Sequence, residues 1–199
     1  MDSNGAADTD PRDDASPARL RQALGQFASG VTVVTTATGE PGDLHAHGMT
    51  ANAFTSVSLE PPLVLISVAA ATATHRRIAG TGRYGISILS EAQEPLSKHF
   101  AGGTQRPELV RFVWRDGLPL LSGALVHLSC RVRQSHRAGD HTLFIGEVEG
   151  LWCGSGPPLV HFRKQLHTLD IPHRGEIPAL HGAGDLLAEE QTERPVHVR

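Results

Sequence analysis

The chain has 199 residues, of which 39% are hydrophobic and 20% are charged, and its formal net charge is -3. This length suits a single domain with one substantial core, and without a basic excess we expect neither nucleic acid nor an anionic membrane surface as a partner. No apolar run approaches the roughly 18 to 20 residues that span a bilayer, and the acidic N-terminus lacks the pattern of a secretory leader, so we expect a cytoplasmic protein.

Composition divides the chain into three parts. Residues 1–16 are rich in Asp, Ala, Ser and Gly with almost nothing to bury, so we expect a disordered acidic tail. Residues 17–168 carry the regular apolar patterns of a folded domain. Residues 169–199 form a polar C-terminal extension whose prolines prevent a long helix.

The first element that the sequence predicts is a short amphipathic helix. Pro17 suits the first helical position. Leu20, Leu24 and Phe27 then recur at helical spacing, and we expect the helix to end near Gly30.

Runs rich in β-branched and apolar residues predict the first strands. Residues 31–38 precede a tight connection at 39–43 and a partner strand at 44–51, which together indicate a hairpin. Residues 63–69 predict a third strand that is apolar enough to be buried on both faces.

The middle of the chain mixes loops, helices and one strand. Small and hydroxyl-bearing residues at 69–75 predict a loop that leads into a brief helix at 76–79. A fourth strand is expected at 84–89 and a helix at 91–100. Residues 104–121 show no regular pattern, and we expect an irregular segment whose aromatic side chains plug the core or the rim of a pocket.

Two long alternating segments at 124–134 and 142–151, joined by 135–141, predict a hairpin, and a last short strand is expected at 159–163. Many short strands with few helices indicate a mainly β protein built as a closed or nearly closed antiparallel barrel. A doubly wound sheet is disfavoured, because its glycine-rich dinucleotide fingerprint is absent.

Residues 47–58 stand out because they are small, polar and uncharged where another hydrophobic strand would be expected. Thr50, Asn52, Ser56 and Ser58 offer hydroxyls, an amide and open backbone that a planar or phosphorylated ligand can approach closely. An edge strand with a polar outer face explains the same composition. Composition alone favours the edge strand.

Residues that commonly bind metals form no recognisable metal site. Cys130 and Cys153 belong to no C-x-x-C motif, and we expect both to be reduced structural residues. His45 and His47 would share one face of a strand, but the chain has neither an H-E-x-x-H motif nor carboxylates at ligand spacing. We therefore expect no metal.

The segment 47–68 resembles the flavin-binding signature of the short-chain flavin reductases, which are the reductase components of two-component flavin monooxygenases. The resemblance runs from about residue 20 to about residue 166, and it includes the segments 30–36 and 139–148 in the family's order. It implies that residues 17–168 form a split β-barrel of the FMN-binding type, antiparallel with Greek-key connections. It also implies a homodimer that holds flavin near the subunit interface.

The resemblance assigns three segments to the flavin. The segment 50–52 would pass the isoalloxazine, 56–58 would lie close to it, and 67–74 is similar to the clasp for the ribityl chain and phosphate. In this loop family members carry more serines, and an aromatic residue stands near the position of His75. The residues so assigned are Thr50, Ala51, Asn52, Ser56, Val57, Ser58, Ser67, Val68, Ala69, Thr72, Thr74 and His75.

The resemblance also implies that Gly139, Asp140, His141 and Thr142 line the nicotinamide side of the pocket, although Gly-Asp by itself is a common turn. We expect His141 to lie closest to the nicotinamide as the catalytic residue, orienting its carboxamide or covering the ring, without acting as an obligate proton donor. Phe162 is expected to wall the pocket, and core packing explains it equally well.

The function that follows is transfer of a hydride from a nicotinamide to a flavin, with the reduced flavin passed to a separate oxygenase. Because the two cofactors supply the reactivity, the protein needs to position them and exclude water. FMN and FAD stay open. NADH is favoured over NADPH, because Arg133 and Arg137 are the only arginines near Gly139.

Two other classes of function remain. The first is a split-barrel protein that binds flavin or haem without turnover, or an oxidase similar to the pyridoxamine-phosphate oxidases. The second is an interaction domain whose tail at 171–199 binds a partner, and the same tail would alternatively cover the nicotinamide cleft as a lid.

Overall fold

The computed structural model describes residues 15–39 and 43–169. The predicted acidic tail and the predicted C-terminal extension lie almost wholly outside the described residues. No helix in the described part of the chain is long and apolar enough to cross a membrane.

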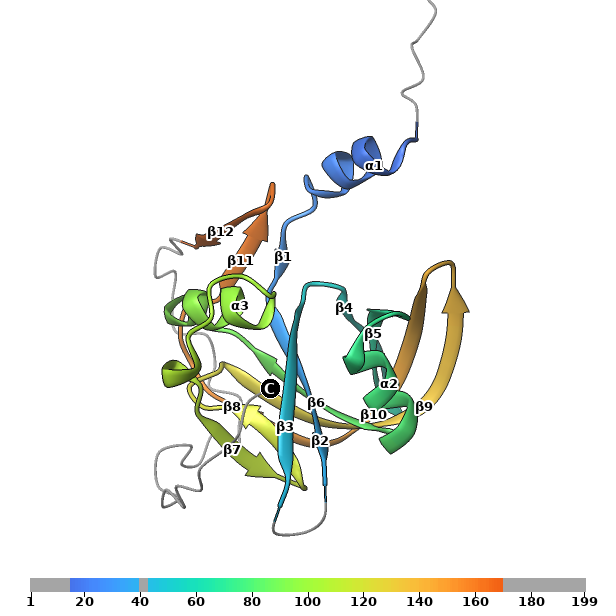
Figure 1. Cartoon of the computed structure of the whole chain (residues 1–199), viewed down its shortest axis with the longest axis vertical. Helices are drawn as coiled ribbons and strands as arrows, with labels where there is room; N and C mark the ends of the chain where they lie inside the picture. The colour runs from blue at the N-terminus through green and yellow to red at the C-terminus, as the bar shows by residue number, and fades with distance from the viewer. Residues whose placement is uncertain (1–14, 40–42, 170–199) are drawn as a thin grey trace, which may run out of the picture.

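A curled antiparallel sheet of seven strands forms the body of the protein (Figure 1). Every pairing between neighbouring strands is antiparallel. In spatial order the strands are β3 (His45–Ala51), β2 (Thr32–Thr38), β6 (Arg83–Ile88), β9 (Val126–Ala138), β10 (His141–Cys153), β5 (Pro62–Ala69) and β4 (Phe54–Leu59).

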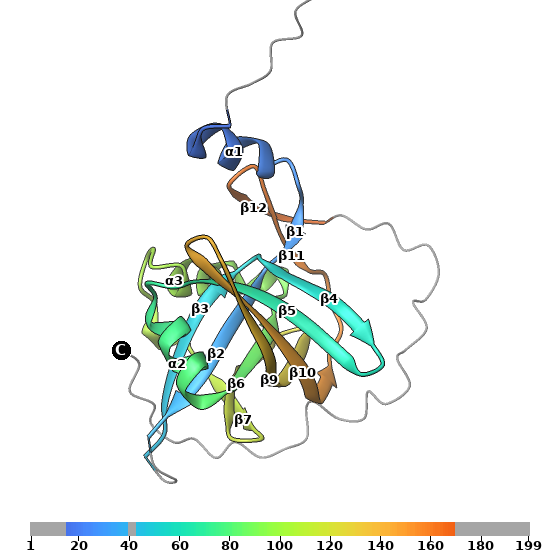
Figure 2. The same cartoon turned by 90° about the vertical axis from the view of Figure 1, so that its right-hand side faces the viewer.

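The two edges of this sheet are neighbours in the chain. Only Asn52 and Ala53 connect the end of β3 to the start of β4, so the edges meet at that end of the barrel. No hydrogen-bonded ladder joins β3 to β4 among the described strands. The barrel is therefore split along this seam, as Figure 2 shows.

Smaller elements surround the barrel. They are α1 (Pro17–Leu24), β1 (Ser29–Gly30), α2 (Ala73–Thr81), the 3-10 turns Glu91–Gln93 and Pro107–Leu109, α3 (Glu94–Phe100), β7 (Phe112–Arg115), β8 (Leu118–Leu121), β11 (Leu159–Phe162) and β12 (Gln165–Thr168). Strands β7 and β8 form a hairpin, and β1, β11 and β12 form a separate small sheet.

Two apolar clusters hold these layers together. The first fills the barrel and is closed by Ile78 of α2. Its buried members are Val34, Ala51, Val64, Ile66, Val68, Ile78, Tyr84, Ile86, Leu128, Cys130 and Phe144. The second lies where α3, β8 and β11 pack beside β2, and its buried members are Val31, Val33, Leu89, Leu96, Phe100, Val110, Leu121 and Leu159.

Helix α1 stands away from the barrel in both views (Figure 1 and Figure 2). None of its residues is buried. The segment that follows it is tied to the small sheet, because the Arg163 N–H donates to the Gly25 carbonyl at 2.8 Å and Arg163 Nε donates to Gln26 Oε1 at 2.9 Å. The apolar side chains of α1 nevertheless face solvent.

The mainly β architecture with few short helices is confirmed, and so are the predicted strands and hairpins. Four local predictions were wrong. The first helix ends at Leu24, because Gly25 caps it well before Gly30. Helix α2 is longer than expected, because with Thr72 as its N-cap it begins at Ala73, three residues early, and it continues to Thr81. The irregular segment contains the β7–β8 hairpin, whose turn places Asp116 at φ 51° and Gly117 at φ 74°.

The fourth correction concerns the long hairpin. Strand β9 continues to Ala138 and β10 begins at His141, so the connection is the two-residue turn at Gly139 and Asp140. The last residues of β9 are polar and exposed, which hides their strand character from an alternating apolar pattern.

Candidate functional site

Three segments converge where β5 ends. Ala69 pairs with His141, and Val68 pairs with Thr142. Just beyond the strand, the Ala70 N–H donates to the Asp140 carbonyl at 2.9 Å. The loop at 69–72 and the first turn of α2 therefore lie beside the Gly139–Asp140 turn. This contact joins two segments that the sequence assigned to different cofactors.

The turn of the hairpin presents an imidazole and a carboxylate to solvent. Gly139 has φ 63°, a conformation that glycine adopts without strain. The His141 ring donates from Nδ1 to Asp140 Oδ1 at 2.7 Å, and the hydrogen bond and charge of His141 lower the pKa of the exposed Asp140 carboxyl. In a neutral ring this bond leaves Nε2 as an acceptor.

Thr72 and Thr74 use their hydroxyls inside the protein. The Thr72 hydroxyl donates to the Ala69 carbonyl at 2.8 Å and accepts the His75 N–H at 3.2 Å, so Thr72 is the N-cap of α2. Buried Thr74 bonds His47 Nε2 at 3.0 Å. The donors left for an anion at this helix start are first-turn backbone N–H groups, and no acidic residue stands in that turn.

His75 reaches from α2 to β10. Its Nε2 lies 2.9 Å from Thr142 Oγ1. Its ring centroid lies 5.4 Å from that of Phe144, and the two planes are tilted by 54°. The departure from the family pattern at this position thus makes a specific hydrogen bond across the junction.

The seam of the barrel brings Asn52 to the small sheet. Ser67 N–H donates to the Ala53 carbonyl at 3.0 Å, which holds the β3–β4 link beside β5. Asn52 Nδ2 lies 3.3 Å from His161 Nδ1 on β11. The next residue, Phe162, has the Arg163 guanidinium 5.0 Å from its ring centroid. The sequence did not predict this contact, since no local pattern indicates a bond across 109 positions.

Other assigned residues lie away from this junction. Ser58 pairs with Leu63, and six residues of strand, about 20 Å, separate Leu63 from Ala69. Ser56 and Val57 lie near that distant end of β4, beside a bulge. One flat ring cannot contact both places within this chain.

Thr50 and Ala51 belong to β3 and serve packing in this structure. The Thr50 hydroxyl donates to the Ser97 carbonyl of α3 at 2.7 Å, and Ala51 lies in the barrel core. The flavin contacts assigned to these residues, and to residues 56–58, stay predictions.

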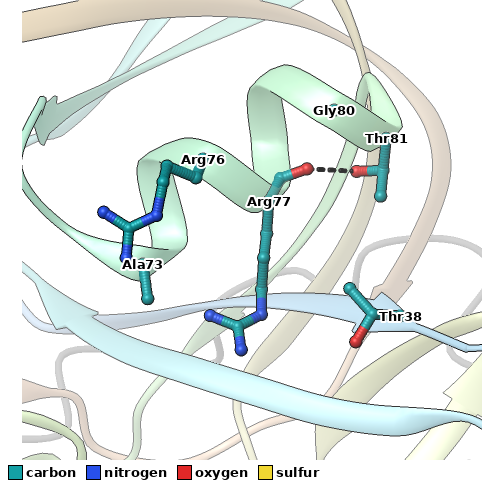
Figure 3. Close-up of a pocket in the computed structure, with 6 residues that line it drawn as sticks. All are labelled: Thr38, Ala73, Arg76, Arg77, Gly80 and Thr81. Atoms are coloured by element: carbon teal, nitrogen blue, oxygen red, sulfur yellow. Dashed lines mark hydrogen bonds between the residues drawn. The ribbon is translucent and has the colours of Figure 1, made fainter.

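A shallow depression lies along α2 and includes Ala73 and Arg76 of its first turn. Figure 3 shows its lining, with the Thr81 hydroxyl donating to the Arg77 carbonyl at 2.9 Å. The lining residues are Thr38, Ala73, Arg76, Arg77, Gly80 and Thr81. Of these residues, Ala73 belongs to the 67–74 segment that the sequence assigned to the flavin. Within residues 15–39 and 43–169, no group of three His, Cys, Asp or Glu side chains is placed to hold a metal.

The fold and the junction define a β-barrel ligand-binding protein that is split along one seam, with small-residue segments and a polar turn at one end. Residues 24–170 match the model of the flavin reductase like domain, and the chain belongs to that family. The resemblance seen in the sequence is thereby confirmed.

Named relatives and solved structures share nearly the whole domain. An NADH-dependent flavin reductase of Rhodococcus is 56% identical over 171 residues, covering 86% of this chain and 96% of the relative. The reductase component of 4-hydroxyphenylacetate 3-monooxygenase from Thermus thermophilus is 41% identical, covering 77% of this chain and 97% of the relative.

The NADH:FAD oxidoreductase of Streptomyces globisporus, solved with NAD and FAD fragments, is 34% identical with a TM-score of 0.74. The match covers 82% of this chain and 98% of that one. The predicted split-barrel class is confirmed by such neighbours.

Proposed function

We propose that the protein is an NADH-dependent flavin reductase that reduces FMN or FAD and supplies the reduced flavin to a separate monooxygenase. The observation that carries this proposal is the contact between the 69–72 loop and the Gly139–Asp140 turn. A hydride donor and a hydride acceptor must lie within contact distance, and this junction puts the segments assigned to each side by side.

The described residues fit a flavin. Strand β4 is an edge strand, so its outer backbone groups have no partner strand in the described part of the chain. Small side chains at Ala69, Ala70 and Ala71 leave space close to the backbone. The first turn of α2 offers N–H groups for a phosphate, and Arg76 follows it with positive charge. A bound flavin supplies the electron-accepting ring atom for the hydride of the nicotinamide.

His141 is suited to orient the nicotinamide. Its Nδ1–H is committed to Asp140, so Nε2 accepts a hydrogen bond from the amide group of a carboxamide. No proton transfer from the ring is needed, because hydride transfer leaves the imidazole unchanged. The residues at the turn therefore act by positioning.

The charge pattern beside the hairpin supports NADH over NADPH. Arg133 forms an ion pair with Glu147, and Arg131 forms one with Glu149. Arginines already paired with carboxylates are poorly placed to receive the 2'-phosphate of NADPH. Arg137 lies at the end of the hairpin, where its backbone is opposite that of Thr142 in the strand ladder.

The first experiment follows NADH oxidation under air with FMN, with FAD and without flavin. We expect oxidation that requires added flavin and saturates with it, and slower oxidation of NADPH. Flavin binding without oxidation of either nicotinamide would overturn the proposal and favour a binding protein or an oxidase. Transfer is tested by adding a flavin-dependent monooxygenase component and measuring substrate hydroxylation.

A homodimer is part of the same proposal. Leu20 and Leu24 of helix α1 are 50% and 64% exposed, and Phe27, three residues beyond the end of the helix, is 79% exposed. Such exposed apolar side chains are stabilised by burial against a second copy. Changing Leu24 and Phe27 together to Asp is expected to shift the mass measured by light scattering from dimer to monomer. The matched control Gln22→Asp, on the polar face, is expected to remain a dimer.

A cytoplasmic location also belongs to this proposal. Cys130 and Cys153 are free thiols, which is the state expected in a reducing compartment where NADH is available. Cell fractionation of the expressed protein tests it, and recovery in a secreted fraction would contradict it.

A further inference from the structure

His75 is held at both ends. Its backbone N–H bonds the Thr72 hydroxyl at the start of α2, and its ring bonds Thr142 and packs on Phe144. Thr142 and Phe144 are two positions apart in β10, so they face the same side of the sheet. The ring of His75 therefore fixes the first turn of α2 against one face of the hairpin strand.

The two strands of the hairpin differ in their support near the turn. The residues of β9 from Gln134 to Ala138 are exposed, whereas β10 pairs with β5 up to its first residue, His141. The bond from the Ala70 N–H to the Asp140 carbonyl continues this contact into the turn. The His75–Thr142 bond is a side-chain tie that joins α2 to β10 beside this ladder.

We propose that His75 is a positioning residue that couples flavin binding to nicotinamide binding through its hydrogen bond with Thr142. This inference rests on the proposed function. A flavin phosphate at the start of α2 restricts the motion of the first turn of that helix. Through the His75–Thr142 bond it also restricts the motion of the hairpin that receives the nicotinamide. Binding of the first ligand then reduces the ordering that the second requires, and the coupling is reciprocal.

The measured quantity is the ratio of the flavin dissociation constants without and with saturating NAD+. Flavin fluorescence quenching gives both constants in the absence of turnover. One neutral hydrogen bond supports a change of about three- to tenfold in this ratio. We expect His75→Phe to lower it by that factor, because phenylalanine retains a ring against Phe144 and loses the bond.

A double-mutant cycle separates the bond from simple packing. Thr142→Val removes the hydroxyl at nearly constant shape and is expected to lower the ratio as much as His75→Phe. The double variant is expected to lower it no further. His75→Gln, which still reaches the Thr142 hydroxyl, is expected to restore most of the ratio.

His47→Phe is the matched control. It removes the other His–Thr bond of α2, from His47 to Thr74, which ties the helix to β3 and not to the hairpin. We expect it to leave the ratio unchanged while lowering the thermal midpoint. The thermal midpoints of all variants report whether each protein is folded.

Two results would overturn the coupling. One is an unchanged ratio in folded His75→Phe, and the other is full additivity of the two substitutions. Failure of the proposed function looks different, since the wild-type protein would then oxidise no NADH with either flavin. A wild type that turns over but shows no effect of NAD+ on flavin affinity refutes the coupling alone.

Discussion

Replacing Gly146 by alanine tests the packing of the barrel core. A Cβ atom built at this position would lie 2.2 Å from the Tyr84 hydroxyl oxygen and 2.7 Å from its Cζ. Tyr84 is fully buried in the first apolar cluster and has no space into which to withdraw. Overpacking of this kind costs about 2 to 3 kcal/mol, so we expect Gly146→Ala to lower the free energy of unfolding by that amount.

The partner variant shows whether the tyrosine is the cause. The Tyr84 hydroxyl is buried, and among the described residues it makes no hydrogen bond of normal geometry, having only a weak contact with the Cys130 thiol. Tyr84→Phe removes the nearest obstacle and is expected to be neutral or slightly stabilising. Combined with Gly146→Ala, it should recover roughly half of the loss, because the ring carbon remains close.

Urea unfolding at one protein concentration measures all three variants, since the proposed dimer would make stability depend on concentration. A Gly146→Ala protein within about 0.5 kcal/mol of wild type would refute the packing argument. So would strictly additive effects of the two substitutions.

Two further predictions concern histidines. His141→Ala should raise the KM for NADH or lower the hydride-transfer rate by about tenfold, measured by stopped flow, and leave the flavin dissociation constant, measured by fluorescence quenching, unchanged. The control His136→Ala, on the same hairpin, should change neither the NADH kinetics nor flavin binding. An equal loss of flavin binding in His141→Ala would place His141 in the flavin site. Burial lowers the pKa of His127, despite its hydrogen bond to the Leu121 carbonyl. The contribution of neutral His127 to the stability of the folded protein is therefore complete above the ordinary pKa of about 6.5 and declines as the pH falls below that value. The urea midpoint should drop more steeply with acid in wild type than in His127→Gln, and parallel curves would contradict this.

The elements that sequence alone predicted are those with a long, regular apolar pattern. Strands β2 and β5 have runs rich in β-branched residues, which favour a strand over a helix or a loop. The β7–β8 hairpin escaped prediction because each strand has four residues, too few to display a period, whereas the equally short β11 follows the Pro157–Pro158 pair that indicates its start. Strand β12 was missed for the same reason.

The residues of the candidate site were predicted by resemblance, but their arrangement was not. The register that sets Ala69 beside His141 joins positions 72 residues apart, and no local pattern encodes it. The bonds from His75 to Thr142 and from Asn52 to His161 likewise depend on the tertiary fold. Conversely, Thr50 looked available in the sequence because its contact with α3 is not visible there.

The seam of the barrel has a consequence for handling the protein. An edge strand such as β4 offers its backbone to any extended peptide, and Leu59 at its end is 90% exposed. The bulge at Val57 interrupts that edge and limits the length over which a foreign strand can pair. The bulge therefore protects this edge against pairing with strands of other molecules. At high concentration the protein should form fewer fibrous aggregates than a protein with a straight edge strand of the same length.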